Sequence, residues 1–144
     1  MRIDKFDQIG IVVRNLKKAA NMYRILMDFK SDLKIVEQFS TVVYKGKEVL
    51  IKMKKIMQHF SGKQFEIIEV VESSGEHLYS EFLKEGKEGL HHLGVYTKDA
   101  EKIIKFFKEK YNIDVIQAGK AGHINFFYLN TKETLGFYLE LIAI

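Results

Sequence analysis

Four polar side chains interrupt segments of this sequence that are otherwise apolar and strand-like. They are Gln8, Glu66, His92 and Glu140. A buried carboxylate is costly unless it is paired, protonated or bound to a metal. An amide oxygen, an imidazole and two carboxylates suit Zn, Ni, Co, Mn or Fe(II), and the chain has no cysteine to offer as a ligand. We therefore predict a divalent-metal site at these residues, in which either glutamate could loosen and act as a base.

The four residues take matching places in a pattern that the chain repeats. Residues 8–29 align with residues 92–113, so that Gln8 falls on His92. The two glutamates fall in matching segments at the end of each copy. A single glutamate or histidine in a strand is more often structural than functional, but four at equivalent places favour one shared site.

The elements that must position these residues follow the order strand, helix, strand, strand, strand in each copy. Asn15 and Asp99 are the predicted N-caps of the two helices, and the first helix should end near Asp28. The predicted strands cover residues 6–13, 33–44, 49–57, 64–71, 91–97, 113–117, 123–129 and 137–143. The pattern predicts an α+β fold in which tandem βαβββ repeats form a curved mixed sheet with the helices on the outside.

The length of the chain predicts one domain over residues 1–144. Its half-repeats should cover residues 6–71 and 90–144, and residues 72–89 should connect them. A short helix is expected in this connector, beginning near His77.

Composition narrows the classes of partner. The net charge of +4 is dispersed, without the basic stripe and interleaved aromatics of a nucleic-acid surface. The lysine-rich residues 52–57 are interpreted as the solvent side of an edge strand. No apolar run approaches the ~18 residues of a membrane span, and residues 1–6 include no apolar segment of a signal peptide, so we do not expect secretion. We expect a cytoplasmic protein that binds neither nucleic acid nor membrane, and an anionic small molecule as its partner.

Several longer stretches resemble the vicinal oxygen chelate superfamily, which includes glyoxalase I, methylmalonyl-CoA epimerase, extradiol dioxygenases and bleomycin-resistance proteins. These stretches are residues 8–19, 65–69, 81–94 and 135–142. The third is most similar to the glyoxalase-like and methylmalonyl-CoA epimerase branch.

The resemblance implies metal ligands at Gln8, Glu66, His92 and Glu140, a set similar to the zinc ligands of the human type of glyoxalase I. Most epimerase-like members carry His at the first position, so Gln8 weakens the epimerase interpretation. Glu140 is the first candidate for the base and Glu66 the second. The epimerase pattern adds a carboxylate base before the third strand, where Glu48 is the nearest candidate.

The function implied by the resemblance is that of a metal-dependent lyase or isomerase. It would act on a small thioester or hemithioacetal through an enolate that is stabilised by a divalent metal of the protein, namely Zn, Ni, Co or Mn. The alternative is a protein that sequesters an antibiotic in the same groove without catalysis. An extradiol dioxygenase would need two histidines and one glutamate, which Gln8 argues against. Family members often form homodimers, and the site could lie within one chain or across an interface.

The remaining candidates have structural interpretations. By strand alternation His91 should face away from His92, and His59 and His77 should be solvated. Lys120 and His123 lie where a substrate could reach, although solvent exposure is the commoner explanation. Tyr44 and Met53 are expected to line the pocket, and residues 126–128 to form core and pocket wall.

Overall fold

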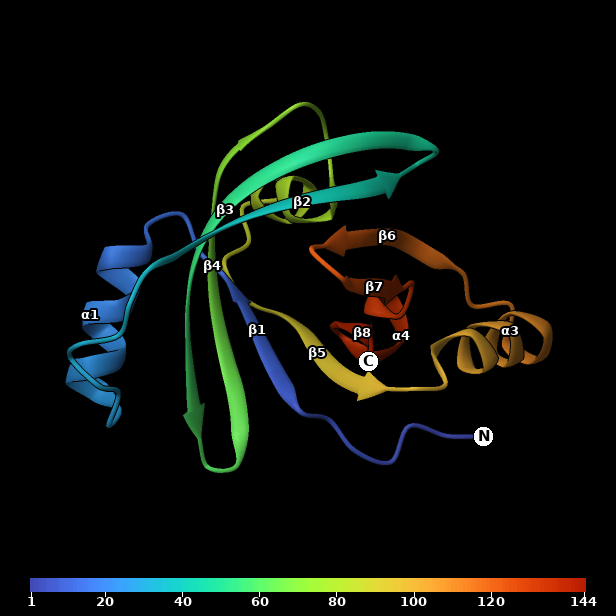
Figure 1. Ribbon diagram of the computed structural model, residues 1–144, viewed down its shortest axis with the longest axis horizontal. Coiled ribbons are helices and arrows are strands. Elements are labelled where there is room, and N and C mark those ends of the chain that lie inside the picture. Colours follow the sequence, from blue (N-terminus) through green and yellow to red (C-terminus); the bar gives the residue numbers. More distant parts are fainter.

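The computed structural model describes all of residues 1–144, which form eight strands and four helices (Figure 1). The elements are β1 (Gln8–Val12), α1 (Leu16–Leu26), β2 (Val36–Tyr44), β3 (Lys47–Phe60), β4 (Lys63–Ser73), α2 (Leu78–Lys84), β5 (Gly89–Thr97), α3 (Ala100–Tyr111), β6 (Val115–Ala121), β7 (Ile124–Leu129), α4 (Lys132–Leu135) and β8 (Tyr138–Ala143). The order β-α-β-β-β recurs as predicted, except that the short α4 precedes the last strand.

The eight strands close into one sheet, in the order β1-β4-β3-β2-β6-β7-β8-β5. Each half of the chain supplies four neighbouring strands. Two antiparallel seams, β1 with β5 and β2 with β6, join the halves. Within each half the first strand runs parallel to the last, β1 with β4 and β5 with β8. The predicted α+β fold with a curved mixed sheet is confirmed, and the sheet curves until its edges meet.

Helices α1 and α3 lie on the outside of the sheet, on opposite sides of the molecule (Figure 1). The Asn15 side chain accepts a hydrogen bond from the backbone N–H of Lys18, as predicted for an N-cap. Asp99 holds the corresponding place before α3, but its side chain makes no capping hydrogen bond. Helix α1 ends at Leu26, close to the predicted end near Asp28, and Phe29 just beyond it is buried in a cluster with Leu16 and Ala20 of the helix.

Two tight hairpins explain why β3 is longer than its predicted range. Lys45 and Gly46 have φ values of 51° and 76°, and Ser61 and Gly62 have φ values of 55° and 78°. Turns with two such residues match the twist of the strands they join, so pairing continues to the residues beside the turn. Strand β3 therefore occupies the middle of the sheet, between β2 and β4, and is not an edge strand.

The connector between the halves contributes to the core. Its helix α2 buries Leu78, Tyr79 and Phe82 in a cluster that includes residues of both halves. None of the four helices combines the length and apolar character that crossing a membrane requires.

Candidate metal and substrate site

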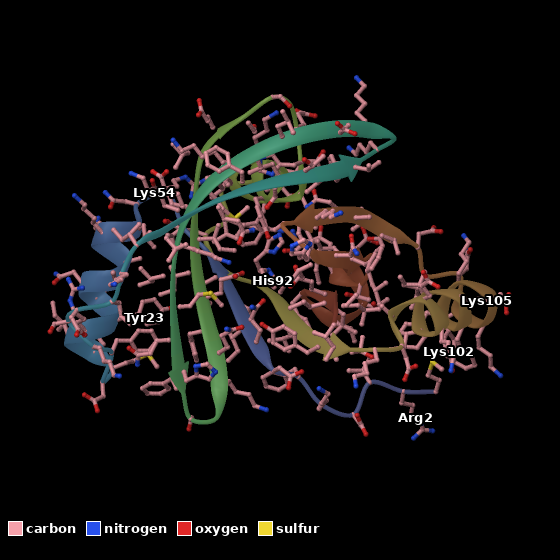
Figure 2. The ribbon with its side chains drawn as sticks, viewed as in Figure 1. Arg2, Tyr23, Lys54, His92, Lys102 and Lys105 are labelled. Atoms are coloured by element: carbon pink, nitrogen blue, oxygen red, sulfur yellow. The ribbon has the colours of Figure 1, made fainter.

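A cavity of about 260 Å³ lies inside the closed sheet, and every strand contributes to its wall. Its lining residues are Gln8, Gln38, Ser40, Val42, Ile51, Met53, Lys55, Met57, Glu66, Tyr79, Tyr96, Gln117, Ala121, Ile124, Phe126, Glu140 and Ile142. Figure 2 shows His92 at the centre of the molecule, between the two halves. The wall is mainly apolar, with a small number of polar groups, as is usual for sites that bind small molecules.

The repeated glycines create the space that the polar side chains occupy. Gly10 on β1 lies between Glu66 on β4 and His92 on β5. A Cβ atom at Gly10 would lie 2.0 Å from the His92 ring, so only glycine allows the imidazole to cross this strand. The first strand of each half thus has a glycine because a side chain of the neighbouring half covers it.

Gly94 does the same for the other pair of polar residues. It lies on β5 between Gln8 on β1 and Glu140 on β8. A Cβ atom there would lie 3.0 Å from Oε1 of Gln8. The two rows, glutamate–glycine–histidine and glutamate–glycine–glutamine, are related by the sequence repeat.

The four predicted residues are brought together within one chain. Nε2 of His92 lies 3.7 Å from Oε1 of Glu66 and 3.8 Å from Oε1 of Glu140. Gln8 lines the same cavity, where its Nε2 donates to Oε1 of Gln64 at 2.9 Å. Six buried side-chain atoms have no hydrogen-bond partner, and two of them, Oε1 of Gln8 and Nε2 of His92, belong to the predicted set. The side chains do not form a ready cluster of three or more His, Asp and Glu ligands.

The two carboxylates have different electrostatic surroundings. Burial raises the pKa of Glu140 above its ordinary value; His92 opposes this rise and the charge of Glu66 adds to it. Burial acts on the pKa of Glu66 in the same direction, but the contacts with His92 and Lys55 outweigh it and the pKa is lowered. Burial alone would lower the pKa of His92, but Glu140 and Glu66 raise it above its ordinary value.

Lys55 is a site residue that the sequence interpretation missed. Its Nζ lies 3.1 Å from Oε2 of Glu66, and the two side chains are only 14% and 11% exposed. The interpretation of residues 52–57 as a solvent-facing edge is wrong for this residue, because β3 is a central strand. Alternation contained the missing signal: Ile51, Met53, Lys55 and Met57 share one face, and three of these four are apolar.

The predicted opposite orientation of His91 is wrong. A register shift in the pairing of β1 with β5 falls at this residue and breaks the alternation. Both imidazoles are fully buried, and Nδ1 of His91 lies 2.9 Å from Nδ1 of His92. Burial, and then the proximity of His92, hold the pKa of His91 well below its ordinary value. His91 is therefore a neutral partner of His92.

His77 is also buried, not solvated as predicted. It is the N-cap of α2, where its Nδ1 accepts from the backbone N–H of Ser80. His59 is exposed as predicted, but it lies on β3 rather than in a turn.

The other weak candidates separate clearly. Met53 and Phe126 line the cavity, as predicted, whereas Tyr44 lies in the core behind it. Glu48 is exposed beside the β2–β3 hairpin and does not line the cavity, so its assignment as a second base is wrong. Lys120 and His123 are exposed to solvent and do not line the cavity.

Comparison with known proteins supports the resemblance. The sequence profile described as "Glyoxalase/Bleomycin resistance protein/Dioxygenase superfamily" matches residues 7–128. No curated protein matches the sequence.

Solved structures share the fold at low sequence identity. A hypothetical protein from Bacillus halodurans C-125 is 21% identical, with a TM-score of 0.66 and coverage of 97% of this chain and 94% of that one. A methylmalonyl-CoA epimerase from Mycobacterium tuberculosis is 16% identical, with a TM-score of 0.64 and coverage of 99% and 92%. An epimerase variant from Streptomyces coelicolor, in complex with 2-nitronate-propionyl-CoA, is 20% identical, with a TM-score of 0.59 and coverage of 99% and 98%.

The profile match covers most of the chain. The fold described above, with its repeated strand, helix and glycine pattern, agrees with this match. The chain belongs to the glyoxalase/bleomycin resistance protein/dioxygenase superfamily.

Proposed function

We propose that this protein is a divalent-metal-dependent lyase or isomerase that moves a proton on a carbon next to a carbonyl group. The observation that carries the proposal is a pair of buried, unpartnered atoms: Oε1 of Gln8, which lines the cavity with Glu66 and Glu140, and Nε2 of His92, which lies beside both glutamates. Buried polar atoms normally have partners, so two without one indicate a ligand.

The donor set fits a divalent cation. Ligand atoms about 2.0–2.2 Å from a tetrahedral metal lie roughly 3.3–3.6 Å from one another. The separations of 3.7 and 3.8 Å between Nε2 of His92 and the two carboxylates are slightly longer, so small side-chain movements would complete the site. Oxygen and nitrogen donors without thiolate suit Zn, Ni, Co or Mn.

His91 supports the fit from behind. A neutral His91 can accept a hydrogen bond at Nδ1 from Nδ1–H of His92, which leaves the lone pair of His92 on Nε2, toward the cavity. Ligating histidines commonly have such a partner on their second nitrogen.

Each side chain has a defined role in the proposal. Gln8 and His92 hold the cation, which when bound supplies a Lewis acid that polarises the substrate carbonyl. Glu140 takes the proton from the adjacent carbon, because no lysine or arginine is paired with it, whereas Glu66 is paired with Lys55. The apolar wall formed by Met53, Phe126 and their neighbours limits access of water to the reacting atoms.

A hemithioacetal of a 2-oxoaldehyde is the preferred substrate class. Glu66 and Glu140 are the only carboxylates that line the cavity, and both belong to the proposed ligand set. With Glu48 outside, the separate second base of the epimerase pattern has no counterpart. The structural neighbours named as methylmalonyl-CoA epimerases keep a CoA thioester as the second candidate.

Metal titration separates the enzyme from an antibiotic-sequestering protein. We expect Co²⁺, Ni²⁺ or Zn²⁺ to bind the purified protein in calorimetry and binding to be lost in His92→Gln. The control is His59→Gln, which removes an exposed imidazole from β3. A wild-type protein that binds none of these metals would contradict the proposal.

Two activity assays then separate the substrate classes. Loss of the hemithioacetal formed from methylglyoxal and glutathione would support the glyoxalase type. Deuterium uptake by methylmalonyl-CoA in heavy water would support the epimerase type. A metal-loaded protein that is inactive in both assays would exclude these two substrates.

A further inference from the structure

Beside each of the two glutamates, the matching strand position carries a different residue. On β3, Met57 pairs with Glu66, and two residues before it is Lys55. On β7, Tyr128 pairs with Glu140, and two residues before it is Phe126. Both Lys55 and Phe126 line the cavity. The repeat thus places a lysine at this strand position of one half and a phenylalanine at the same position of the other.

The lysine occupies one oxygen of Glu66. Nζ of Lys55 lies 3.1 Å from Oε2, while Oε1 lies 3.7 Å from Nε2 of His92. One oxygen therefore faces the ammonium group and the other faces the proposed metal position. Glu140 has no lysine or arginine partner, and its one ion-pair partner is His92.

We propose that Lys55 makes the site one-sided: it fixes Glu66 as a ligand and leaves Glu140 as the only base. This inference rests on the proposed metal-dependent proton transfer. For Glu66 to accept a substrate proton, it would have to give up its charge, which would leave the Lys55 ammonium without a partner in a largely buried position. Breaking a buried pair in this way is strongly unfavourable. Glu140 has no lysine partner, so its protonation leaves no ammonium group unpaired.

The chemical consequence is that the proton leaves and returns on one face of the substrate. In a hemithioacetal, the C–H bond next to the sulfur breaks, its electron pair stays in the substrate as an enediolate, and the proton passes to Glu140. The same proton, or one exchanged with solvent, then returns from Glu140 to the neighbouring carbon, and the hydroxyl proton of the first carbon moves to the oxygen of that neighbour. The aldehyde carbon is thereby oxidised to the thioester level and the ketone carbon reduced to an alcohol, without an external oxidant.

One-sidedness predicts which substrate stereoisomer is used. Glu66 and Glu140 are related by the pseudo-twofold repeat, so they approach a substrate at the metal from opposite sides. A site with one working base should remove the hydrogen of only one hemithioacetal diastereomer. The other diastereomer must first revert to aldehyde and thiol.

Lys55→Met is the variant that tests this, with Lys54→Met as the matched control. Methionine keeps an unbranched side chain between Met53 and Met57 but removes the charge. Lys54 precedes Lys55 on β3 and does not line the cavity. Figure 2 shows Lys54 on the side of α1, away from His92. Lys55→Arg keeps a cation and should behave as the wild type.

The first readout is the affinity for Co²⁺, which titration calorimetry measures. Loss of the neighbouring positive charge should tighten Co²⁺ binding in Lys55→Met roughly tenfold. Lys54→Met and Lys55→Arg should stay close to the wild type.

The second readout is the progress curve of the methylglyoxal–glutathione hemithioacetal at high enzyme concentration. The wild type, Lys54→Met and Lys55→Arg should show two phases, the slower one set by interconversion of the diastereomers. Lys55→Met should show a single phase, because both carboxylates can then act.

The outcomes distinguish this inference from the proposed function. If the wild type binds no Co²⁺, the proposed function fails. If it binds Co²⁺ but Lys55→Met matches Lys54→Met in affinity and phases, or if the wild type already shows one phase, the role of Lys55 is overturned. If the wild type binds Co²⁺ without consuming this hemithioacetal, the Co²⁺ affinities are compared alone. Tighter binding by Lys55→Met than by Lys54→Met then supports the role of Lys55, and equal binding overturns it.

Discussion

The two halves of this protein share a backbone plan but not an active-site chemistry. In both, a glycine on the first strand makes room for a polar side chain of the other half, and a glutamate arrives on the adjacent parallel strand. The first half contributes an amide, Gln8, where the second contributes an imidazole, His92. It also has a lysine where the second half has a phenylalanine.

This difference shows how a repeated fold can produce a site with distinct roles. The backbone symmetry brings four donors to one place, because equivalent strands meet at the β1–β5 seam. Side chains at neighbouring positions then determine which carboxylate is paired and which is left available. The pKa of Glu66 is lowered because its contacts with His92 and Lys55 outweigh burial, whereas burial dominates at Glu140 and raises its pKa.

Exchanging the two glutamates in turn is the strongest way to break the comparison. Measured at saturating Co²⁺, Glu140→Gln should lower the rate of proton transfer by about 10³-fold, within the usual contribution of a general base. Glu66→Gln should lower it less, because the base remains. The measurement is hemithioacetal turnover, with circular dichroism as the control for folding. Equal losses in the two variants would indicate that the carboxylates share the proton-transfer role.

Removing Gln8 or His92 tests the difference between the amide donor of the first half and the imidazole donor of the second. His92→Ala should weaken Co²⁺ binding by more than ~100-fold, since even the outer partners of metal ligands contribute 10- to 100-fold to affinity. Gln8→Ala should weaken it less, because an amide oxygen is a poorer donor than imidazole. Titration calorimetry gives both affinities. A larger loss in Gln8→Ala would reverse the order of importance proposed for the two halves.

The two glycines should also differ, in stability rather than in binding. A Cβ atom at Gly10 would lie 2.0 Å from the buried His92 ring, whereas one at Gly94 would lie 3.0 Å from Oε1 of Gln8. We expect Gly10→Ala to lower the free energy of unfolding by about 2–3 kcal/mol and Gly94→Ala by about 1 kcal/mol, the range known for overpacking. Urea denaturation of the metal-free protein measures both. Gly75→Ala is a suitable control, because its Cβ would have only one neighbour, at an ordinary contact distance of 3.6 Å.

These comparisons also show what the sequence could predict. Repetition and periodicity were sufficient for the fold and for the meeting of Gln8, Glu66, His92 and Glu140, because those residues interrupt apolar strands at equivalent positions. Their role as metal ligands stays a prediction.

The residues that the sequence interpretation misplaced depend on pairing that one strand alone does not show. Lys55 does not face solvent as predicted, because the closure of the sheet turns its face of β3 toward the cavity, and closure depends on long-range pairing. His91 was assigned to the wrong face because a local register shift disrupts strand alternation. Glu48 was proposed from resemblance, but the tight turn at Lys45 and Gly46 places it beside the hairpin, outside the cavity.

The smallest expected effect is the pH dependence of stability in the metal-free protein, and it should have opposite signs for the two glutamates. Glu66 has a lowered pKa in the folded state, because its contacts with His92 and Lys55 outweigh the effect of burial. It therefore stabilises the fold above the ordinary carboxyl pKa, and this contribution is lost as the pH falls through the lowered value. Glu140 has a pKa raised by burial, so its favourable contribution is present below the ordinary value and is lost as the pH rises through the raised one.

At pH 7 Glu66→Gln should destabilise the protein, whereas Glu140→Gln should stabilise it, and both differences should shrink toward pH 4. Urea denaturation of the two variants at both pH values tests this, and the same sign for both at pH 7 would mean that Lys55 does not distinguish the two carboxylates.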